Sequence, residues 1–148
     1  RLIGYEKRDI ADKDFRNNNV DAGEVGSNQS VTALYELKLN DNVNSGKVGS
    51  LFLRYKDVDK GDNVIEVNKD VDLKNLTDFS NASSSTKLAI SVAEYAENLK
   101  EGYWANQTNL NDILVLTKQV NQELNSPDKV SELVNLMSRT ISLKSSLR

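Results

Sequence analysis

The stretch LFLRYKDVDKGDNVIEVN, Leu51 to Asn68, decides the fold class of the first half of the chain. Apolar residues alternate with their neighbours from Leu51 to Tyr55 and again from Val64 to Asn68, which is the spacing of two typical of a half-exposed strand. Between them lies KDVDKGDN, which is rich in residues that favour turns. The stretch therefore predicts an antiparallel β-hairpin.

Two further segments in the first half also have the character of strands. The segment Val31–Leu39 reads VTALYELKL, with apolar residues at every odd position and mostly polar residues between them. Leu34 breaks the alternation, so both sides of this strand are expected to be partly covered. The opening run RLIGYEKR, Arg1–Arg8, is also predicted to be a strand.

Near residue 80 the spacing of apolar residues changes from two to three and four, which predicts helices. The first helix is expected to follow the serines Ser83–Ser85 and to stop at Gly102, because glycine commonly follows a helix end. Its apolar stripe consists of Leu88, Val92, Tyr95, Ala96 and Leu99.

Two more helices are predicted beyond Gly102. Asn109 is a suitable N-terminal cap for the second helix, and Pro127 is tolerated in the first turn of the third. The second stripe consists of Leu110, Ile113, Leu114, Thr117, Val120 and Leu124, and the third of Val130, Leu133, Val134, Met137 and Ile141. The expected fold is α+β: a single domain over residues 1–148, with a small antiparallel sheet from the strand-rich part (1–75) packed against three helices of the helical part (80–148).

Composition excludes several classes of function. The chain of 148 residues has a net charge of -3 without a cluster of Lys and Arg, which argues against nucleic-acid binding. Cys and His are both absent, so thiol nucleophiles, disulfides, the usual zinc sites and Ser-His-Asp relays are excluded. No run of apolar residues is long enough to span a membrane. Because the chain starts at Arg1 and already reads as strand there, we expect it to be a C-terminal fragment of a longer protein.

The acidic turn between the hairpin strands is a weak candidate for a calcium site. Asp57, Asp59 and Asp62 are hard oxygen ligands close together, as calcium requires. Counted from Asp57, however, the EF-hand positions for the glycine and the bidentate acid hold Asp62 and Asn68. We therefore favour a structural turn.

The run DFSNAS, Asp78–Ser83, nearly matches the Asp-x-Ser-x-Ser pattern with which von Willebrand factor A domains hold magnesium. Ala82 stands in place of the second hydroxyl, and a buried apolar strand does not lead into Asp78. Capping of the following helix is the more economical interpretation.

Tyr103 and Trp104 follow the first helix and have two interpretations. An exposed aromatic pair could bind a carbohydrate or a peptide. Without a second aromatic cluster in the chain, we favour a place in the core.

The loop DAGEVG, Asp21–Gly26, supplies the last candidates, Asp21 and Glu24, which together with Glu6 could serve as carboxylates for acid-base catalysis. Gly23 and Gly26 permit unusual backbone angles, and the acids could bond neighbouring amides or an arginine such as Arg8 or Arg16. The loop lacks the extra glycine and the following helix of a phosphate cradle. A packed turn is favoured over a ligand loop, and an enzyme is not expected.

Several of these runs together resemble a known family. RLIGYEKR, the pair DF at Asp14 and Phe15, DAGEVG and VTALYEL closely resemble the start of the C-terminal domain of bacterial von Willebrand factor type A domain-containing proteins, the YfbK-like family. Downstream, LRYKDVDKGD, AISVAEYAENL and NLNDILVLTKQV resemble the strand, acidic turn and helices of that family, so the resemblance covers essentially the whole chain. SNQS replaces a loop in which relatives often have a Gly-His pair, so a role for that histidine does not carry over.

The resemblance implies a context rather than a reaction. In such proteins a von Willebrand A domain that holds magnesium precedes this domain of unknown function, and the proteins resemble periplasmic factors or lipoproteins of the cell envelope. We therefore expect a non-enzymatic accessory or interaction domain without a cofactor of its own, whose partners are the adjacent von Willebrand A domain and a further protein. The alternatives are a carbohydrate- or peptide-binding module that uses Tyr103 and Trp104, and a carboxylate-based hydrolase.

Overall fold

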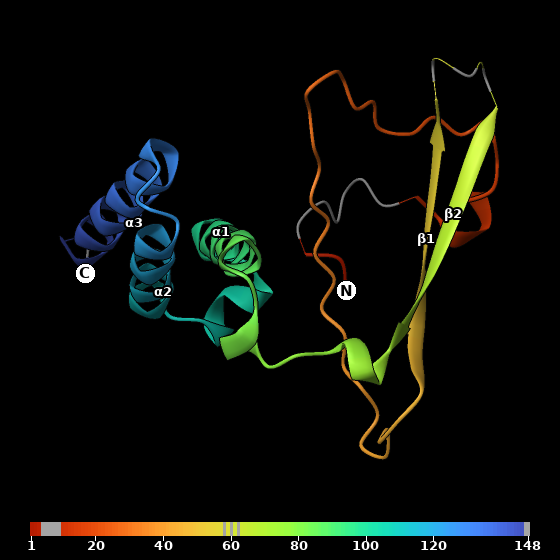
Figure 1. Cartoon of the computed structure of the whole chain (residues 1–148). Helices are drawn as coiled ribbons and strands as arrows, with labels where there is room; N and C mark the ends of the chain where they lie inside the picture. The colour runs from red at the N-terminus through yellow and green to blue at the C-terminus, as the bar shows by residue number, and fades with distance from the viewer. Residues whose placement is uncertain (4–9, 58, 60, 62, 147–148) are drawn as a thin grey trace. The chain divides into compact units, whose positions relative to one another are not determined.

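The computed structural model describes residues 1–3, 10–57, 59, 61 and 63–146. The chain divides into two compact units, Arg1–Thr77 and Asp78–Arg148. Strands occur in the first unit and the long helices in the second (Figure 1), which confirms the predicted α+β class. The division lies near residue 80, where the apolar spacing of the sequence changes.

The first unit is built on the predicted β-hairpin. Strand β1 (Lys47–Lys56) pairs antiparallel with β2 (Val64–Asp72), with Leu53 opposite Val67 and Arg54 opposite Glu66. An irregularity between Lys47 and Gly49 shifts the register at the start of β1. These two strands are the whole sheet within the described residues.

The pairing gives the hairpin one apolar and one polar face. Leu51, Leu53 and Tyr55 lie on the same side as Ile65, Val67 and Lys69, because directly opposed residues share a face. We call the five apolar residues of this set the apolar hairpin face. Four of them are exposed and Ile65 is half-buried. A face of this composition is normally covered in an antiparallel sheet.

The middle of the polar hairpin face contacts the segment Phe15–Asn18, which follows the short 3-10 helix η2 (Asp12–Asp14). Arg54 donates from Nη1 to the carbonyl oxygen of Phe15 at 2.5 Å and from Nη2 to Oδ1 of Asn18 at 2.9 Å. Arg16 donates to both carboxylate oxygens of Glu66 at 2.8 and 3.1 Å. Both guanidinium groups also lie within 6 Å of the Phe15 ring centre, a cation–π arrangement.

The prediction of a strand over Val31–Leu39 is wrong. The structure has a single bridge there, Leu2 with Tyr35, formed by hydrogen bonds from Ile3 N to Leu34 O and from Glu36 N to Arg1 O. Alternating apolar residues favour an extended strand, but a strand also needs backbone hydrogen bonds to a neighbouring strand along its length. Beyond Ile3, most of the predicted strand Arg1–Arg8 lies outside the described residues.

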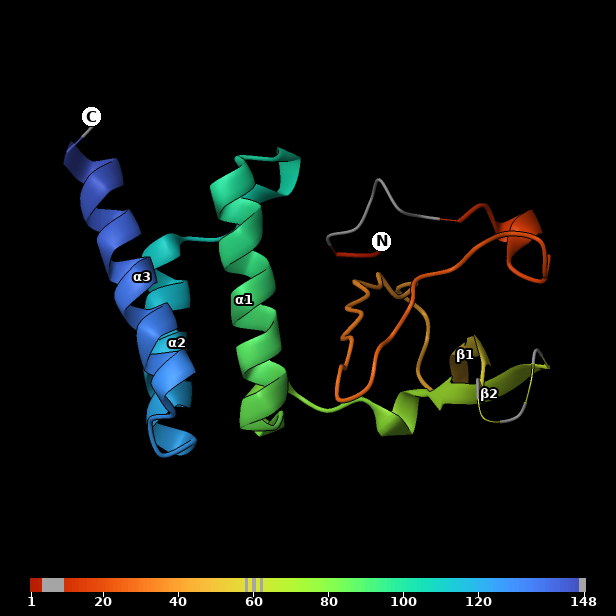
Figure 2. The same cartoon turned by 90° about the horizontal axis from the view of Figure 1, so that it is seen from above.

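The second unit contains the three predicted helices, α1 (Ser84–Lys100), α2 (Leu110–Glu123) and α3 (Asp128–Ser146). Seen from above, the three lie side by side (Figure 2), with α2 in contact with both others. Their core is formed by Tyr95, Ile113 and Met137, against which Leu110, Leu114 and Leu133 pack. The predicted stripes of α2 and α3 are therefore confirmed.

The apolar stripe predicted for α1 is only partly right. Tyr95 is buried as expected, but Val92 and Leu99 are exposed, and Ser91 and Asn98 are buried instead. Burial of these polar side chains is possible because they bond to the backbone of their own helix: Ser91 Oγ donates to Lys87 O at 2.9 Å and Asn98 Nδ2 to Glu94 O at 3.0 Å. Apolar spacing alone did not identify the buried side of α1.

The helix ends follow the predicted caps with one difference. Ser83 Oγ accepts from Thr86 N at the start of α1, and Asn109 Oδ1 accepts from Asn111 N at the start of α2. The left-handed residue after α1 is Glu101, with φ of 52°, and not Gly102, so the predicted stop is displaced by one position. Within the described residues, none of the helices has the length and apolar character needed to cross a membrane.

Candidate functional site

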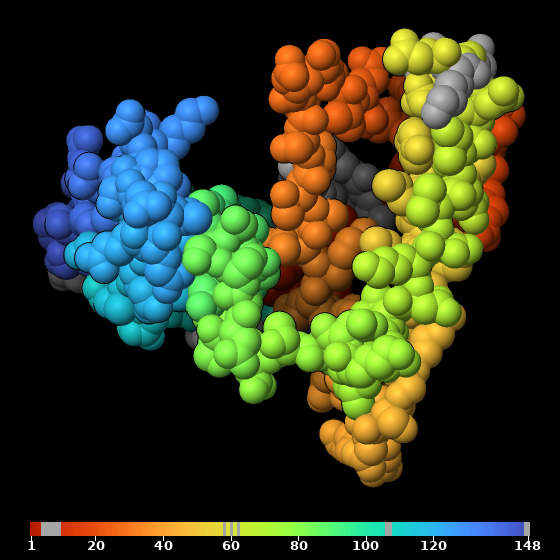
Figure 3. All heavy atoms as spheres, in the orientation of Figure 1, coloured from red at the N-terminus to blue at the C-terminus, as the bar shows by residue number. Residues whose placement is uncertain are grey.

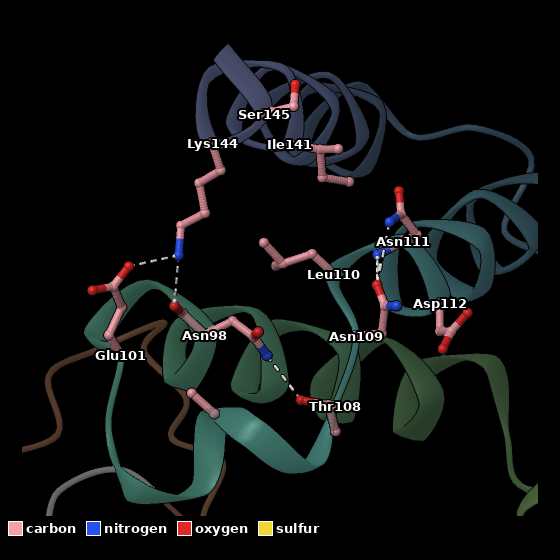
Figure 4. Close-up of a pocket in the computed structure, with 11 residues that line it drawn as sticks. Asn98, Glu101, Thr108, Asn109, Leu110, Asn111, Asp112, Ile141, Lys144 and Ser145 are labelled. Atoms are coloured by element: carbon pink, nitrogen blue, oxygen red, sulfur yellow. Dashed lines mark hydrogen bonds and ion pairs between the residues drawn. The ribbon is translucent and has the colours of Figure 1, made fainter. Parts of the chain in front are cut away.

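A polar cleft of about 940 Å³ lies at one end of the helical unit. It is lined by the C-terminal ends of α1 and α3, the N-terminal end of α2 and the 3-10 helix η6 (Tyr103–Gln107), as Figure 4 shows. Ala105, Leu110 and Ile141 are its aliphatic residues, and the others carry amide, hydroxyl or charged groups. This cleft is the main candidate for a ligand site among the residues that the structure describes.

Lys144 connects α3 to the end of α1 across the cleft. Its Nζ donates to Oε1 of Glu101 at 3.0 Å and to the carbonyl oxygen of Asn98 at 3.3 Å. Asn98 in turn donates from Nδ2 to Oγ1 of Thr108 at 2.8 Å. These side chains thus use their hydrogen-bonding capacity to hold three elements together, which is a structural role.

The two carboxylates of the cleft do not face each other. Figure 4 shows Glu101 and Asp112 at opposite ends of the labelled row of side chains. The hydrogen bond from Lys144 holds the pKa of Glu101 below its ordinary value, so Glu101 is ionised. Acid-base catalysis by two carboxyl groups needs one of them to keep its proton, which requires a raised pKa.

We expect the Lys144→Met substitution to return the pKa of Glu101 to its ordinary value near 4.5. Because the pKa is lowered in the folded chain, the ion pair stabilises the fold above pH 4.5 and this contribution is lost as the pH falls through the lowered value. Titration of the Glu101 side-chain carbon by NMR measures the shift. An unchanged pKa in the variant would contradict the assignment of its cause to Lys144.

Tyr103 and Trp104 lie in η6, next to the cleft in sequence but not among its lining residues. Tyr103 is 81% exposed and Trp104 36% exposed, and their rings meet edge to face with centres 4.9 Å apart. The interpretation of this pair as core is therefore wrong for Tyr103. A short 3-10 helix at a helix end presents successive side chains in different directions, so adjacent aromatic residues need not share a core.

The acidic turn of the hairpin shows turn geometry at its described residues. Asp57 Oδ1 accepts a hydrogen bond from Asp59 N at 3.1 Å, as an aspartate does when it closes a local turn. Asp62 lies outside the described residues. Within the described part of the chain, groups of three or more possible metal-ligating acids are not found.

The loop of Asp21 and Glu24 is exposed, and Asp21 Oδ1 accepts from the amide of Ala22 at 3.1 Å. Gly26 N donates to Gln29 Oε1 at 2.9 Å, and the left-handed residue of this loop is Asn28, with φ of 59°. Gly23 and Gly26 do not use the unusual angles that glycine permits, and Asn28, a residue type that tolerates the left-handed region, adopts them instead. Arg16, suggested as a partner of these acids, pairs with Glu66, and Glu6 and Arg8 lie outside the described residues.

The run Asp78–Ser83 forms a helix start rather than a cation site. Ser83 caps α1, and the buried Lys87 donates from Nζ to the carbonyl oxygen of Ser80 at 2.9 Å. An ammonium group at this position disfavours a magnesium ion nearby because the two positive charges repel each other. The capping interpretation is confirmed at Ser83.

The sequence did not reveal the cluster of Arg16, Arg54 and Glu66. Arg16 and Glu66 are 50 positions apart, so their pairing leaves no spacing signal. The pKa of Glu66 is lowered, first by the hydrogen bond from Arg16. The only available signal was Arg54 itself, a charged residue in the middle of an apolar strand.

Comparison with known proteins identifies the family. The model of the family described as "Uncharacterized protein YfbK, C-terminal" matches residues 1–47 and 38–143. A relative described as "Uncharacterized protein YfbK", from Escherichia coli (strain K12), is 52% identical over 40 residues, which are 27% of this chain and 7% of the relative. The matched part of the chain thus spans a small fraction of that curated relative. A match to a solved structure is not found. Since the family model covers most of the chain, the chain belongs to the YfbK C-terminal domain family.

Proposed function

We propose that this chain is a non-enzymatic interaction module that packs beside a von Willebrand A domain of the same polypeptide in the cell envelope. In this proposal, magnesium and the adhesive surface belong to the neighbouring domain, and this module presents or restrains that surface. The observation that carries the proposal is the exposed apolar hairpin face. A soluble protein rarely leaves such a face uncovered, and an exposed apolar patch commonly marks an interaction site.

The contrast between the two sides of the hairpin supports this interpretation. The polar hairpin face carries the interactions of Arg16, Arg54 and Glu66, which hold residues of the same unit against the middle of this face. On the apolar hairpin face, Leu53 is 57% exposed although it lies at the centre of the sheet. The two sides of the sheet therefore differ in their contacts, because ion pairs and hydrogen bonds to Arg16 and the segment Phe15–Asn18 lie on the polar hairpin face.

The size of the apolar hairpin face favours a partner in the same polypeptide. From the rise per residue and the spacing of strands, two paired strands of this length cover roughly 300 Å². Stable complexes between separate proteins bury about 800 Å² on each partner. A covalent link raises the effective concentration of the partner and makes a small interface sufficient.

The charged groups support a non-enzymatic role. Glu66, Asp70, Glu101 and Glu123 each have a pKa below the ordinary value, caused first by a hydrogen bond from Arg16, Lys47, Lys144 and Ser84, respectively. Such carboxylates are ionised at neutral pH and serve as acceptors within the fold. A general acid would need the opposite shift.

Single cysteines test the proposal directly, because the natural chain contains none. Leu53→Cys places a thiol on the apolar hairpin face, and Val115→Cys places one on α2, where the residue is 66% exposed. We expect both to react with a maleimide at similar rates in the 148-residue chain. In the full-length gene product, position 53 should react at least about ten-fold more slowly and position 115 at an unchanged rate.

The extent of maleimide labelling is measured by mass spectrometry on the peptides that contain positions 53 and 115. Labelling of other cysteines in the full-length product then does not affect the result. Equal reactivity of Leu53→Cys in both proteins would refute a neighbour on the apolar hairpin face. Slower reaction at both positions would indicate general burial rather than a specific interface.

A second candidate function is favoured by the exposure of Tyr103. An exposed aromatic pair beside a cleft with several amide groups is an arrangement that can bind a carbohydrate or a peptide. Trp104 is the only tryptophan, so its fluorescence reports on this site alone. Quenching by iodide that is relieved by an oligosaccharide or peptide, and that is not relieved in Tyr103→Ala, would support this function over the first.

A further inference from the structure

We propose that two copies of this chain associate through one side of the helical unit, where exposed aliphatic residues of α1 and α3 lie beside a contact between these two helices. We call Val92, Leu99, Leu136 and Leu143 the α1–α3 seam. The seam belongs to the second unit and the apolar hairpin face to the first, so this proposal does not depend on the proposed function.

Polar contacts link α1 to α3. The hydroxyl oxygens of Tyr95 and Thr140 are 2.7 Å apart, and Lys144 Nζ donates to the carbonyl oxygen of Asn98 at 3.3 Å. The order of these contacts along both helices means that α1 and α3 run in the same direction, as Figure 2 shows. Figure 3 shows the green atoms of α1 directly against the blue atoms of the helical unit. The two helices therefore present side chains at matching heights on either side of the Tyr95–Thr140 contact.

On α1, the seam residues are helical neighbours of Tyr95. Val92 lies three positions before it and Leu99 four positions after it, and residues at these spacings share a helix face. The opposite neighbours at the same spacings, Ser91 and Asn98, are buried, whereas Val92 and Leu99 are exposed. Val92 and Leu99 thus lie beside the contact, on the side that faces away from the core.

On α3, the seam residues have the same relation to Thr140. Leu136 lies four positions before it and Leu143 three positions after it, and both are exposed. Met137, which lies three positions before Thr140, is buried in the core. Leu136 and Leu143 therefore also lie on the side of the contact that faces away from the core, next to the exposed residues of α1.

The seam collects the exposed large apolar residues of both helices. In α1 and α3, which the structure describes throughout, the large apolar residues that are exposed are the four of the seam, and their exposed fractions are 44% to 63%. An exposed apolar patch of adjacent residues commonly marks a protein interaction site. The side of α1 and α3 that faces away from the core is therefore suited to contact with another protein surface.

The spacing of the seam residues suits a second copy of the same surface. Val92 and Leu99 are seven positions apart, and so are Leu136 and Leu143, so each pair spans about 10.5 Å along its helix. A two-fold rotation then places each apolar pair against a pair of equal length in the second copy. Two-fold dimers are the commonest soluble assemblies, and their interface must be complementary to itself. The seam meets this requirement.

The area of this side is sufficient for weak association between separate chains. Helices α1 and α3 have 17 and 19 residues. From the rise per residue and the helix diameter, the two together present a surface of roughly 25 by 20 Å, or about 500 Å² on each copy. The total of about 1,000 Å² is the lower limit for a specific interface. We therefore expect a reversible dimer with a dissociation constant on the order of tens of micromolar, so that dilute solutions contain the monomer.

Sedimentation equilibrium of the 148-residue chain tests the proposal over concentrations on both sides of this dissociation constant. We expect the average mass to rise from that of the monomer toward twice that value. In the same range, the methyl resonances of the seam residues should shift with concentration, and those of Val115 should not. A constant monomer mass, or shifts at Val115 without shifts in the seam, would overturn the proposal.

Charged substitutions locate the interface. Leu143→Lys is expected to raise the dissociation constant at least about ten-fold, because a two-fold dimer contains the substitution twice. Val115→Lys is the matched control, since Val115 is about as exposed as Leu143 but lies on α2. Leu53→Lys changes the apolar hairpin face. Both controls should leave the dissociation constant unchanged.

Far-UV circular dichroism verifies that each variant keeps its helices, which is expected because the substituted positions are exposed. Unchanged association in Leu143→Lys, or an equal loss in Val115→Lys, would contradict an interface at the seam. Loss of association in Leu53→Lys alone would assign the dimer to the apolar hairpin face and would also overturn the proposal. A monomeric 148-residue chain together with slow maleimide reaction at Leu53→Cys in the full-length product would refute the dimer and leave the proposed function in place.

Discussion

Replacing Tyr95 with alanine is expected to lower the free energy of unfolding of the helical unit by about 3–5 kcal/mol, the range for loss of a buried aromatic side chain. The Tyr95 ring is part of the core, and its hydroxyl lies 2.7 Å from Oγ1 of Thr140. The residue thus contributes both apolar contact and a polar link from α1 to α3. Urea unfolding followed by the far-UV circular dichroism of the helices measures the effect.

The Tyr95→Phe variant is the matched control for the hydroxyl group. It keeps the ring and removes only the hydrogen bond to Thr140, so we expect a loss of about 1 kcal/mol. Equal losses for Phe and Ala would mean that the ring contributes nothing beyond its hydroxyl, which would contradict the described core.

The Met137→Ala substitution is expected to cost about 2–5 kcal/mol in the same measurement, because it leaves a cavity among Tyr95, Ile113 and Leu133. Met137 is 1% exposed, whereas its neighbour Leu136 is 51% exposed. The Leu136→Ala variant changes helix α3 one position earlier and should alter the free energy of unfolding by less than about 0.5 kcal/mol. A large effect at 136 with a small one at 137 would show that α3 is rotated relative to this description.

The elements that depend on local signals were predictable from the sequence. The hairpin was found because alternation flanks a turn-rich segment, and α2 and α3 because their stripes are apolar at every position except Thr117. Ser83 and Asn109 were identified as caps because the preference for Ser and Asn at this position has a local cause, the unpaired amides of the first turn.

The features that were missed depend on contacts that sequence spacing does not encode. The buried side of α1 includes Ser91 and Asn98, whose polar atoms bond to backbone carbonyls. Val31–Leu39 has the pattern of a strand, but whether it forms one depends on partners elsewhere in the chain. Within the candidate site, Lys144 reaches Glu101 from 43 positions away, and a single lysine near the end of the sequence gave no indication of this pairing.

The concentration of buried residues in Asp78–Arg148 also affects the calorimetry of the 148-residue chain. The heat capacity change of unfolding arises mainly from apolar surface that becomes hydrated. Residues that are already hydrated in the native state add little to it. We therefore expect the heat capacity change of unfolding of this chain to be close to that of a protein of about half its length. A value calculated from the full number of residues would overestimate this heat capacity change, and with it the curvature of the free energy of unfolding with temperature.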